Sequence, residues 1–281
     1  MPVYLNGSYV PKEQAMVSVD DRGFVFGDGV YEVIRASNGR LFEPERHVRR
    51  LERSLREISL TLPEAELRGL IDVWRELLRA NDVESGDAIV YMQVTRGAAP
   101  RAHQFPAAIR PTVFASAAAW TLPTALRTRG ARVITVPDVR WSRCDIKTIT
   151  LLPNVLAKQR AVEAGADEAL FVRDGVVLEG AVSNFFAVID GALCTHPLTT
   201  YILGGITRDV VLELASSAGI PIRETPILLD HISRATELFY TNTTNDVIPI
   251  VTVDSRVVAD GLPGPITGRL YTALCARITA S

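Results

Sequence analysis

Two strand-rich halves separated by a short Thr/Pro stretch constrain the fold of this chain more than any other feature. In both halves, runs of apolar and β-branched residues lie between turn dipeptides, which is the pattern of β-strands. The stretch Trp120-Thr121-Leu122-Pro123-Thr124 follows a finished strand and is the best candidate for a linker. We therefore expect a mixed α+β (α/β mixed) protein of two domains, with residues 1–120 in the first, 121–125 as the linker and 126–281 in the second.

The N-terminal half combines strands with two amphipathic helices. Asn6-Gly7 and Asn38-Gly39 are hairpin dipeptides, since both central residues of such a turn need positive φ. Apolar residues spaced by three and four predict the helices. The predicted elements are a hairpin at 3–10, strands at 30–36, 39–42, 88–95 and 112–119, and helices at 45–60 and 63–80.

The C-terminal half repeats this mixture with more strands. Asp174-Gly175 and Asp190-Gly191 indicate hairpin turns, and Gly165 and Gly219 end predicted helices. The segment 139–148 is predicted to be strand-like, so that it supports a side chain rigidly. The other predicted elements are strands at 131–136, 168–173, 176–179, 184–189, 238–241 and 248–253, and helices at 153–165, 207–218 and 266–278.

Composition and charge exclude several classes of protein. The net charge is −2 and acids are interleaved with arginines, so nucleic acid is not an expected partner. The N-terminus lacks a signal-peptide pattern, and the long uncharged stretches contain Pro, Gly and Thr, so no membrane segment is expected. Cys144, Cys194 and Cys275 have neither paired nor metal-ligand spacing, so we expect no metal site and a cytoplasmic location.

Lysine is almost absent, and this limits the candidates for amine chemistry. The chain has 30 basic residues, of which only Lys12, Lys147 and Lys158 are lysines. A lysine amine can lose its proton and form a carbon–nitrogen double bond, whereas arginine keeps its charge. Most lysines simply lie at the surface, as we expect for Lys12 and Lys158. Lys147 has apolar neighbours, which favours it as the nucleophile of a Schiff-base enzyme.

Three other patterns each have a functional and a purely structural interpretation. Gly204-Gly205 before a helix is a possible site for one phosphate group or an ordinary loop. Further along the chain, the Thr/Asn-rich stretch 241–245 either offers further hydrogen-bond donors or is a polar turn. Glu179 is an exposed turn acid, a partner for a buried cation, or the carboxylate that keeps a pyridine nitrogen protonated. Arg101 and His103 suit capture of a carboxylate, but also fit a solvated loop.

Taken together, these segments resemble class IV (fold-type IV) pyridoxal-phosphate aminotransferases, and within them the D-amino acid branch. The matching stretches run in family order over nearly the whole chain. They are Asp21-Arg22-Gly23-Phe24, Phe26-Gly27-Asp28-Gly29-Val30-Tyr31-Glu32-Val33, Arg101-Ala102-His103, Arg143-Cys144-Asp145-Ile146-Lys147, Leu156-Ala157-Lys158-Gln159, Glu179-Gly180, Ser183-Asn184 and Gly205-Ile206-Thr207-Arg208-Asp209. The resemblance implies a smaller N-terminal α/β domain and a larger, β-barrel-like C-terminal domain that binds pyridoxal 5'-phosphate.

The resemblance also implies a role for particular residues. Lys147 would be the Schiff-base lysine and the acid/base for the substrate α-proton, and Glu179 would pair with the pyridine nitrogen. The phosphate would be held by Arg50, the amides of Ile206 and Thr207, and Thr243, with Arg140 near the ring hydroxyl and Leu203 against the ring. Substrate would be bound by Tyr31, Val33, Arg35, Arg101 and His103, the last two reaching in from the other subunit of a homodimer.

The implied reaction moves the amino group of D-amino acids such as D-alanine or D-glutamate to 2-oxo acids such as 2-oxoglutarate or pyruvate. The Arg101-Ala102-His103 pattern matches this branch. Two departures leave the substrate range open, since Arg35 replaces a lysine and Ala181-Val182 replaces two serines. The alternatives are a branched-chain L-amino acid aminotransferase, an (R)-amine transaminase, an aminodeoxychorismate lyase, or a non-enzymatic protein that binds the cofactor.

Overall fold

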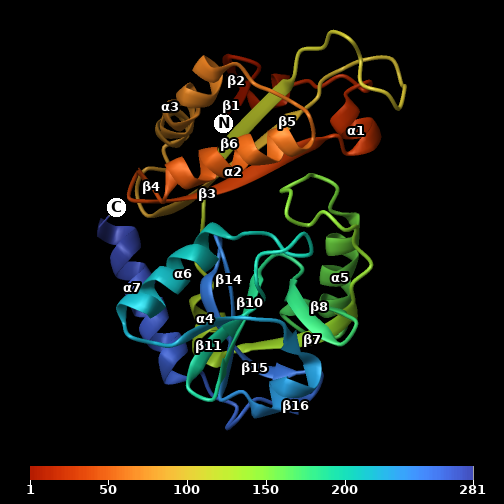
Figure 1. Ribbon diagram of the computed structural model, residues 1–281. Coiled ribbons are helices and arrows are strands. Elements are labelled where there is room, and N and C mark those ends of the chain that lie inside the picture. The colour runs from red at the N-terminus through yellow and green to blue at the C-terminus, as the bar shows by residue number, and fades with distance from the viewer. Residues whose placement is uncertain (281) are drawn as a thin grey trace. The chain divides into compact units, whose positions relative to one another are not determined.

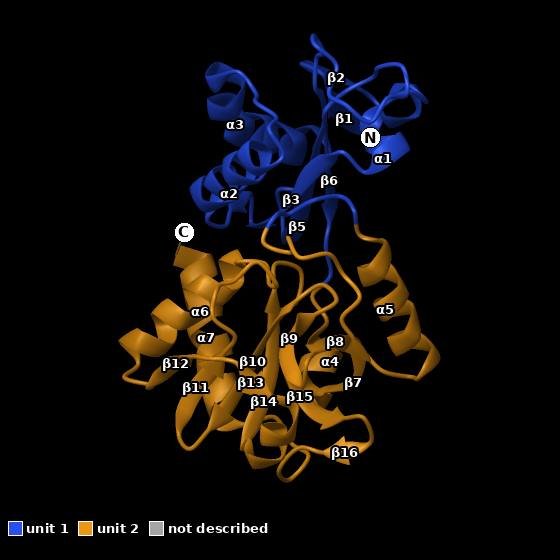
Figure 2. Cartoon of the chain, turned by 45° about the vertical axis from the view of Figure 1, so that its right-hand side comes forward, with its two compact units in different colours: residues 1–121, 146–150, 281 blue, residues 122–145, 151–280 orange. Residues whose placement is uncertain are grey.

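The computed structural model describes residues 1–280 and separates into two compact units (Figure 2). Unit 1 contains Met1–Thr121 and Ile146–Thr150, and unit 2 contains Leu122–Asp145 and Leu151–Ala280. The units follow the expected division closely but not at every residue: 146–150 clusters with unit 1, and the predicted linker 121–125 divides between the units after Thr121. Ser281, the last residue of the predicted C-terminal domain, lies outside the described residues.

Unit 1 is a six-stranded antiparallel sheet with helices packed against it (Figure 1). The strand order is β2-β1-β6-β5-β3-β4. Trp74 and Leu77 of α3 are fully buried, and burying a side chain of this kind contributes about 1.5–3 kcal/mol. The elements are β1 (Pro2–Leu5), β2 (Ser8–Pro11), the 3-10 helix η1 (Lys12–Gln14), α1 (Arg22–Phe26), β3 (Gly29–Ser37), β4 (Arg40–Leu41), α2 (Pro44–Glu57), α3 (Glu64–Ala80), β5 (Asp87–Thr95) and β6 (Thr112–Ala119).

Unit 2 is built around a sheet that closes on itself. Its strands pair in the order β10-β14-β15-β7-β8-β9, and β9 pairs again with β10 through Glu179 and Asn184. This closure forms the β-barrel-like body that was expected, and it fixes the positions of both residues at the seam. The ring consists of β7 (Ala131–Pro137), β8 (Glu168–Arg173), β9 (Val176–Gly180), β10 (Asn184–Ile189), β14 (Glu237–Asn242) and β15 (Asp246–Val253).

Shorter strands and five helical segments complete unit 2. α5 packs on β7 and β8, while α6 and α7 pack on each other and on β14. The remaining elements are α4 (Thr124–Arg129), α5 (Leu152–Glu163), β11 (Ala192–Thr195), α6 (Ile206–Ser217), β12 (Ile222–Glu224), β13 (Ile227–Leu228), the 3-10 helix η2 (Leu229–Arg234), β16 (Arg256–Val257) and α7 (Pro265–Ala280).

The mixed α+β fold class is confirmed, and one predicted strand is wrong. The segment 139–148 consists of turns and bends, with an isolated bridge between Thr148 and Val30. Arg143 pairs with the nearby Asp145 rather than alternating along a strand, and the Cys144 amide donates to the Thr200 carbonyl. Tertiary contacts therefore support Lys147 in place of a regular strand.

Candidate active site

The backbone around Lys147 is fastened to the start of β3. The Tyr31 amide donates to the Lys147 carbonyl at 3.0 Å, and the Lys147 amide donates to Ser54 Oγ at 3.3 Å. The hydroxyl of Thr148 and the amide of Ile149 both donate to the Gly29 carbonyl. A Cβ on Gly29 would overlap the Val94 carbonyl, so only glycine allows this close approach.

The Lys147 side chain is half-buried and lies over an aromatic ring. Its Nζ is 4.1 Å from the centroid of the Tyr31 ring, a cation–π distance. Tyr31 in turn stacks on Tyr91 with ring centroids 5.9 Å apart. The structure thus brings together the predicted nucleophile and one predicted substrate-binding residue. Lys12 is exposed, and Lys158 pairs with Glu168 at 3.6 Å, so neither shares this environment.

Arg50 is held in a fixed orientation by a buried carboxylate. Its Nε and Nη2 each contact an oxygen of Glu32 at 2.7 Å, a bidentate pair, and His47 Nδ1 lies 2.8 Å from the same carboxylate. Burial would raise the pKa of Glu32, but Arg50 and His47 lower it well below its usual value. Burial lowers the pKa of His47, the Glu32 carboxylate opposes this, and the charges of Arg50 and Lys147 add to the lowering, so that the net shift is downward. The centre therefore contains a carboxylate, a guanidinium and a neutral imidazole.

The predicted substrate-binding residues of β3 share one face of that strand. Tyr31, Val33 and Arg35 alternate with the buried Glu32 and Ile34. The Arg35 guanidinium is itself buried and pairs with Asp87 Oδ1 at 2.9 Å. Its charge is thus partly committed to a protein carboxylate.

The loop that carries Arg101 and His103 lies against Phe26. The Arg101 guanidinium is 5.1 Å from the Phe26 ring centroid, and the His103 ring is 5.5 Å from it. Arg101 is exposed. No hydrogen bond or ring contact within residues 1–280 joins either residue to Tyr31. The structure brings the loop pair together, but not with the third residue of the predicted carboxylate site.

In unit 2, Glu179 is the centre of a buried polar network. Arg140 Nη1 lies 2.5 Å from Glu179 Oε1, and Glu179 Oε2 accepts from Asn184 Nδ2 and from the Leu203 amide, each at 3.1 Å. Arg140 also pairs with Asp138, whose side chain is fully buried, at 2.9 Å. Burial raises the pKa of Glu179 to about 7, and the Arg140 charge limits this rise. Such a carboxyl can accept or release a proton near neutral pH.

The start of α6 supplies further donors. Gly205 at the helix N-cap gives no side-chain hydrogen bond, so amides of the first turn, including those of Ile206 and Thr207, lack such a cap. Gly205 lies so close to Asn184 that a Cβ would overlap the Asn184 amide oxygen. Asn184 pairs in turn with Thr241 across β10 and β14. These residues are therefore neighbours.

Two buried polar atoms at the end of β14, a strand that α6 contacts, have no partner among the described residues. They are Oγ1 of Thr241 and Nδ2 of Asn242, next to the predicted phosphate ligand Thr243. Leaving a buried donor unpaired costs about 1–3 kcal/mol, so a ligand acceptor is the natural partner. An uncapped helix start and two orphaned groups fit a phosphate, with the carboxylate of Glu179 in the same unit for a ring nitrogen. The residues present therefore fit pyridoxal phosphate.

Several residues of these networks were not predicted from the sequence as site residues. Glu32 and His47 orient Arg50, while Asp138 and Asn184 orient Arg140 and Glu179. The sequence does offer a signal for Glu32, because a carboxylate within a largely apolar strand indicates a buried partner. Asn184 gave a similar one, because it precedes the buried pair Phe185-Phe186. Asp138 and His47 gave none that local sequence could distinguish.

Residues 1–280 contain neither a candidate membrane span nor a candidate metal cluster. None of the helices there combines the length and hydropathy that crossing a bilayer requires. In the same residues, no three or more His, Cys, Asp or Glu side chains are grouped so that they would hold a metal ion.

Similarity to known proteins extends over nearly the whole chain. Residues 29–253 match the family model described as amino-transferase class IV. D-alanine aminotransferase of Staphylococcus haemolyticus is 44% identical over 95% of this chain and 94% of the relative. That of Bacillus licheniformis is 43% identical over 98% of this chain and 96% of the relative.

Solved structures give the same fold at lower identity. The branched-chain amino acid aminotransferase of Escherichia coli superposes with a TM-score of 0.91 at 26% identity, covering 98% of this chain and 93% of the other. The branched-chain amino acid aminotransferase of Thermoproteus uzoniensis, solved with norvaline, has a TM-score of 0.89 at 29% identity, covering 100% and 95%.

Proposed function

This chain belongs to the class IV aminotransferases, and from that premise we propose that it uses pyridoxal 5'-phosphate to move the amino group of D-amino acids to 2-oxo acids. The family resemblance seen in the sequence is confirmed by the match over residues 29–253. Identity of 42–44% to D-alanine aminotransferases, against 26–30% to the similar branched-chain enzymes of known structure, favours the D-amino acid branch.

We propose that two groups carry the chemistry. Bound pyridoxal phosphate supplies an electron-poor ring that takes up the charge left when the substrate α-proton is removed. Nζ of Lys147 accepts that proton and returns it on the same face, which makes proton transfer one-handed. Glu179, held by Arg140 and Asn184, keeps the proton on the ring nitrogen. The Lys147 amine over Tyr31 is the observation that best supports this assignment.

Several of the proposed cofactor ligands are held by hydrogen bonds within their own unit. Arg50, oriented by Glu32, and the first amides of α6 are proposed as phosphate donors, together with Thr243. The unpartnered Asn242 Nδ2 is added to the residues predicted from sequence, since the same acceptor would satisfy it. Leu203 donates its amide to Glu179 and is proposed to pack on the ring.

Paired D- and L-amino acids test the proposed substrate class. We expect D-alanine to change the near-visible absorption of the cofactor-loaded protein, because the α-proton of the D-substrate alone would face Lys147. L-Leucine is expected to leave that absorption unchanged. The reverse result would favour the branched-chain alternative, and no cofactor absorption at all would refute aminotransferase activity.

We propose further that the chain acts as a homodimer. α5 buries only Ala157 and Ala161, while it exposes large apolar side chains on the rest of its surface. Leu152 is 67% exposed and Val155 58%, and Leu156 and Val162 are likewise open. Contiguous exposed apolar groups of this kind mark contact surfaces, and a second copy offers a matching one. In such a dimer, Arg101 and His103 would complete the partner's substrate site.

Mixed dimers test whether Arg101 binds the substrate carboxylate in the partner's site or in the site of its own subunit. Arg101→Ala should raise KM for D-alanine about 10- to 100-fold, the effect of losing one charge-assisted bidentate contact, with little loss of cofactor. If Arg101 acts across the dimer, combining Arg101→Ala with Lys147→Ala subunits restores one intact site in each mixed dimer. We expect recovered turnover at low substrate after unfolding and refolding the two variants together.

Two outcomes would contradict this assignment. A mixture no more active than the sum of its separate variants places Arg101 in its own subunit's site. Equal losses of substrate affinity and of cofactor from Arg101→Ala would make the residue structural. Lys12→Ala, which changes an exposed lysine of η1, serves as the matched control.

A cytoplasmic location is part of the proposal. Cys144, Cys194 and Cys275 are free thiols in the structure. Unpaired cysteines are typical of a reducing compartment.

A further inference from the structure

Arg22 donates to three consecutive carbonyls of the loop that carries Arg101 and His103. Its Nη1 lies 2.6 Å from the Ala102 carbonyl oxygen and 3.5 Å from that of Gln104, and its Nη2 lies 3.4 Å from that of His103. Arg22 is 4% exposed, so its guanidinium is largely shielded from water, while His103 and Gln104 of the loop are exposed. A planar guanidinium with several donors fixes a curved stretch of backbone more rigidly than single bonds at separate points.

A half-buried carboxylate, that of Asp28, fixes Arg22 itself. Asp28 Oδ2 accepts from Nε of Arg22 and from Nε of Arg96, each at 2.8 Å. Burial would raise the pKa of Asp28, but the two guanidiniums lower it below its usual value. Arg96 continues the network with bonds to the carbonyls of Ser59 at 3.0 Å and Ile58 at 2.6 Å. Through these two arginines, the Asp28 carboxylate is linked both to the segment after α2 and to the loop that carries Arg101 and His103.

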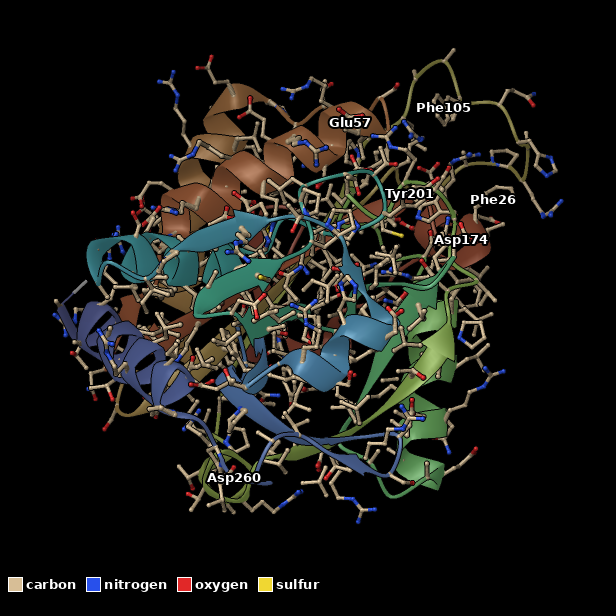
Figure 3. The ribbon with its side chains drawn as sticks, turned by 60° about the horizontal axis from the view of Figure 1, so that its bottom comes forward. Phe26, Glu57, Phe105, Asp174, Tyr201 and Asp260 are labelled. Carbon is tan, nitrogen blue, oxygen red and sulfur yellow. The ribbon has the colours of Figure 1, made fainter. Side chains whose placement is uncertain are left out.

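Two aromatic rings complete the support. The Arg22 guanidinium lies 4.8 Å from the Phe26 ring centroid and 5.9 Å from that of Phe105 (both labelled in Figure 3). Phe26 is also the ring against which Arg101 and His103 lie. One short helix, α1, therefore supplies both the guanidinium that holds the loop backbone and the ring that supports its two side chains.

The backbone at the base of the loop is constrained as well. The Arg22 amide donates to the Gly97 carbonyl at 2.8 Å. Gly97 has φ of 103°, and a Cβ there would overlap the Arg110 carbonyl. The Asp21 side chain caps α1 through the Gly23 amide and accepts from Thr95 Oγ1 at 2.9 Å.

We propose that Arg22 is a positioning residue for the substrate carboxylate: it sets the conformation of 101–104 and thereby the direction of Arg101 and His103. This inference rests on the proposed function, since it assumes that these two side chains meet the carboxylate. Arg22 touches neither substrate nor cofactor in this scheme. It therefore affects how tightly any α-carboxylate is bound, for amino acid and 2-oxo acid alike, and leaves proton transfer alone.

Two substitutions test the proposal. Arg22→Gln removes the charge and most donors, whereas Arg22→Lys keeps a charge for Asp28 and loses the fork that spans three carbonyls. In both we expect KM for D-alanine and for 2-oxoglutarate to rise about tenfold or more, as for loss of a charged hydrogen-bond contact. The kcat at saturation and the cofactor content should stay close to those of the unaltered enzyme.

Amide hydrogen exchange of the cofactor-loaded protein measures how well the loop is ordered, and it does not depend on turnover. Peptides covering 98–106 should exchange faster in both variants, while those of β3 and β5 stay protected. Arg129→Gln, which breaks an exposed pair with Asp167, is the control and should change neither KM nor loop exchange.

Specific results would overturn the proposal. They are unchanged KM in both variants, a raised KM with unchanged loop exchange, and faster exchange with unchanged KM. If Arg22→Gln fails to fold, Arg22→Lys decides by the same measurements. Absence of turnover in the unaltered protein would instead refute the proposed function, and exchange would still show whether Arg22 orders the loop.

Discussion

Lys147→Ala should abolish transamination and, with it, covalent fixation of the cofactor by borohydride. The chain has only two other lysines, and neither lies in the environment described for Lys147. General acid–base catalysis by a placed side chain contributes about 10²–10⁴-fold, and loss of the amine also removes covalent attachment. We therefore expect a drop in kcat of at least this size, measured with D-alanine and 2-oxoglutarate.

The other two lysines of the chain provide the controls. Lys12→Ala and Lys158→Ala should retain borohydride fixation and turnover. Lys147→Arg keeps the positive charge over the Tyr31 ring but cannot form the imine, so it should be as inactive as Lys147→Ala. Added methylamine should partly restore proton transfer to Lys147→Ala by acting as a diffusible base. Undiminished turnover or borohydride fixation in Lys147→Ala would refute the assignment.

Much of the fold could be predicted because its signals are local. Asn6-Gly7 adopts positive φ between β1 and β2, as the hairpin dipeptide predicts, and β6, β8 and β10 have their predicted bounds. α1 was missed because five residues are too few to show helical periodicity. The short helix α4 was missed for the same reason, and β12, β13 and β16 were missed because two or three residues are too few to show the alternation of a strand.

The segment around Lys147 shows why local pattern has a limit. Its apolar residues predicted a strand, but its backbone donors and acceptors are taken by Gly29, Tyr31 and Ser54, which lie far away in the sequence. Similarly, the resemblance gave roles to Arg50, Arg140 and Glu179, but not to Glu32 and Asn184, which help to orient them. Glu32 and Asn184 act through pairings set by strand register and barrel closure, which no short window contains.

Glu179→Gln should lower kcat strongly while the cofactor stays bound. A neutral amide of the same size can still accept from Arg140, so the network around Asp138 stays partly satisfied. It cannot keep a proton on the ring nitrogen. Removing one such electrostatic contribution typically costs about 10²–10³-fold in kcat, and we expect a loss of this order with D-alanine. Glu179→Asp, which keeps the charge but shortens the reach, should lose less.

The same substitution changes how stability depends on pH in the cofactor-free protein. The folded-state pKa of Glu179 is raised from 4.5 to about 7, so the folded state holds this proton more tightly than the unfolded chain does. The contribution of Glu179 to the free energy of unfolding is thus full below pH 4.5 and is lost as pH rises to about 7. At about 1.36 kcal/mol per pKa unit, the loss is about 3 kcal/mol.

Urea unfolding at pH 5 and pH 8 measures this effect against Glu179→Gln, which does not titrate. Relative to the variant, the unaltered cofactor-free protein should lose stability between the two pH values. Arg234→Gln, which breaks an exposed ion pair with Asp190, is the control and should show no such pH-dependent difference. A constant or rising difference for Glu179→Gln would mean that Glu179 is already ionised at pH 5. In that case Arg140 outweighs burial, and the carboxylate is fixed in its charged form before any ring nitrogen arrives.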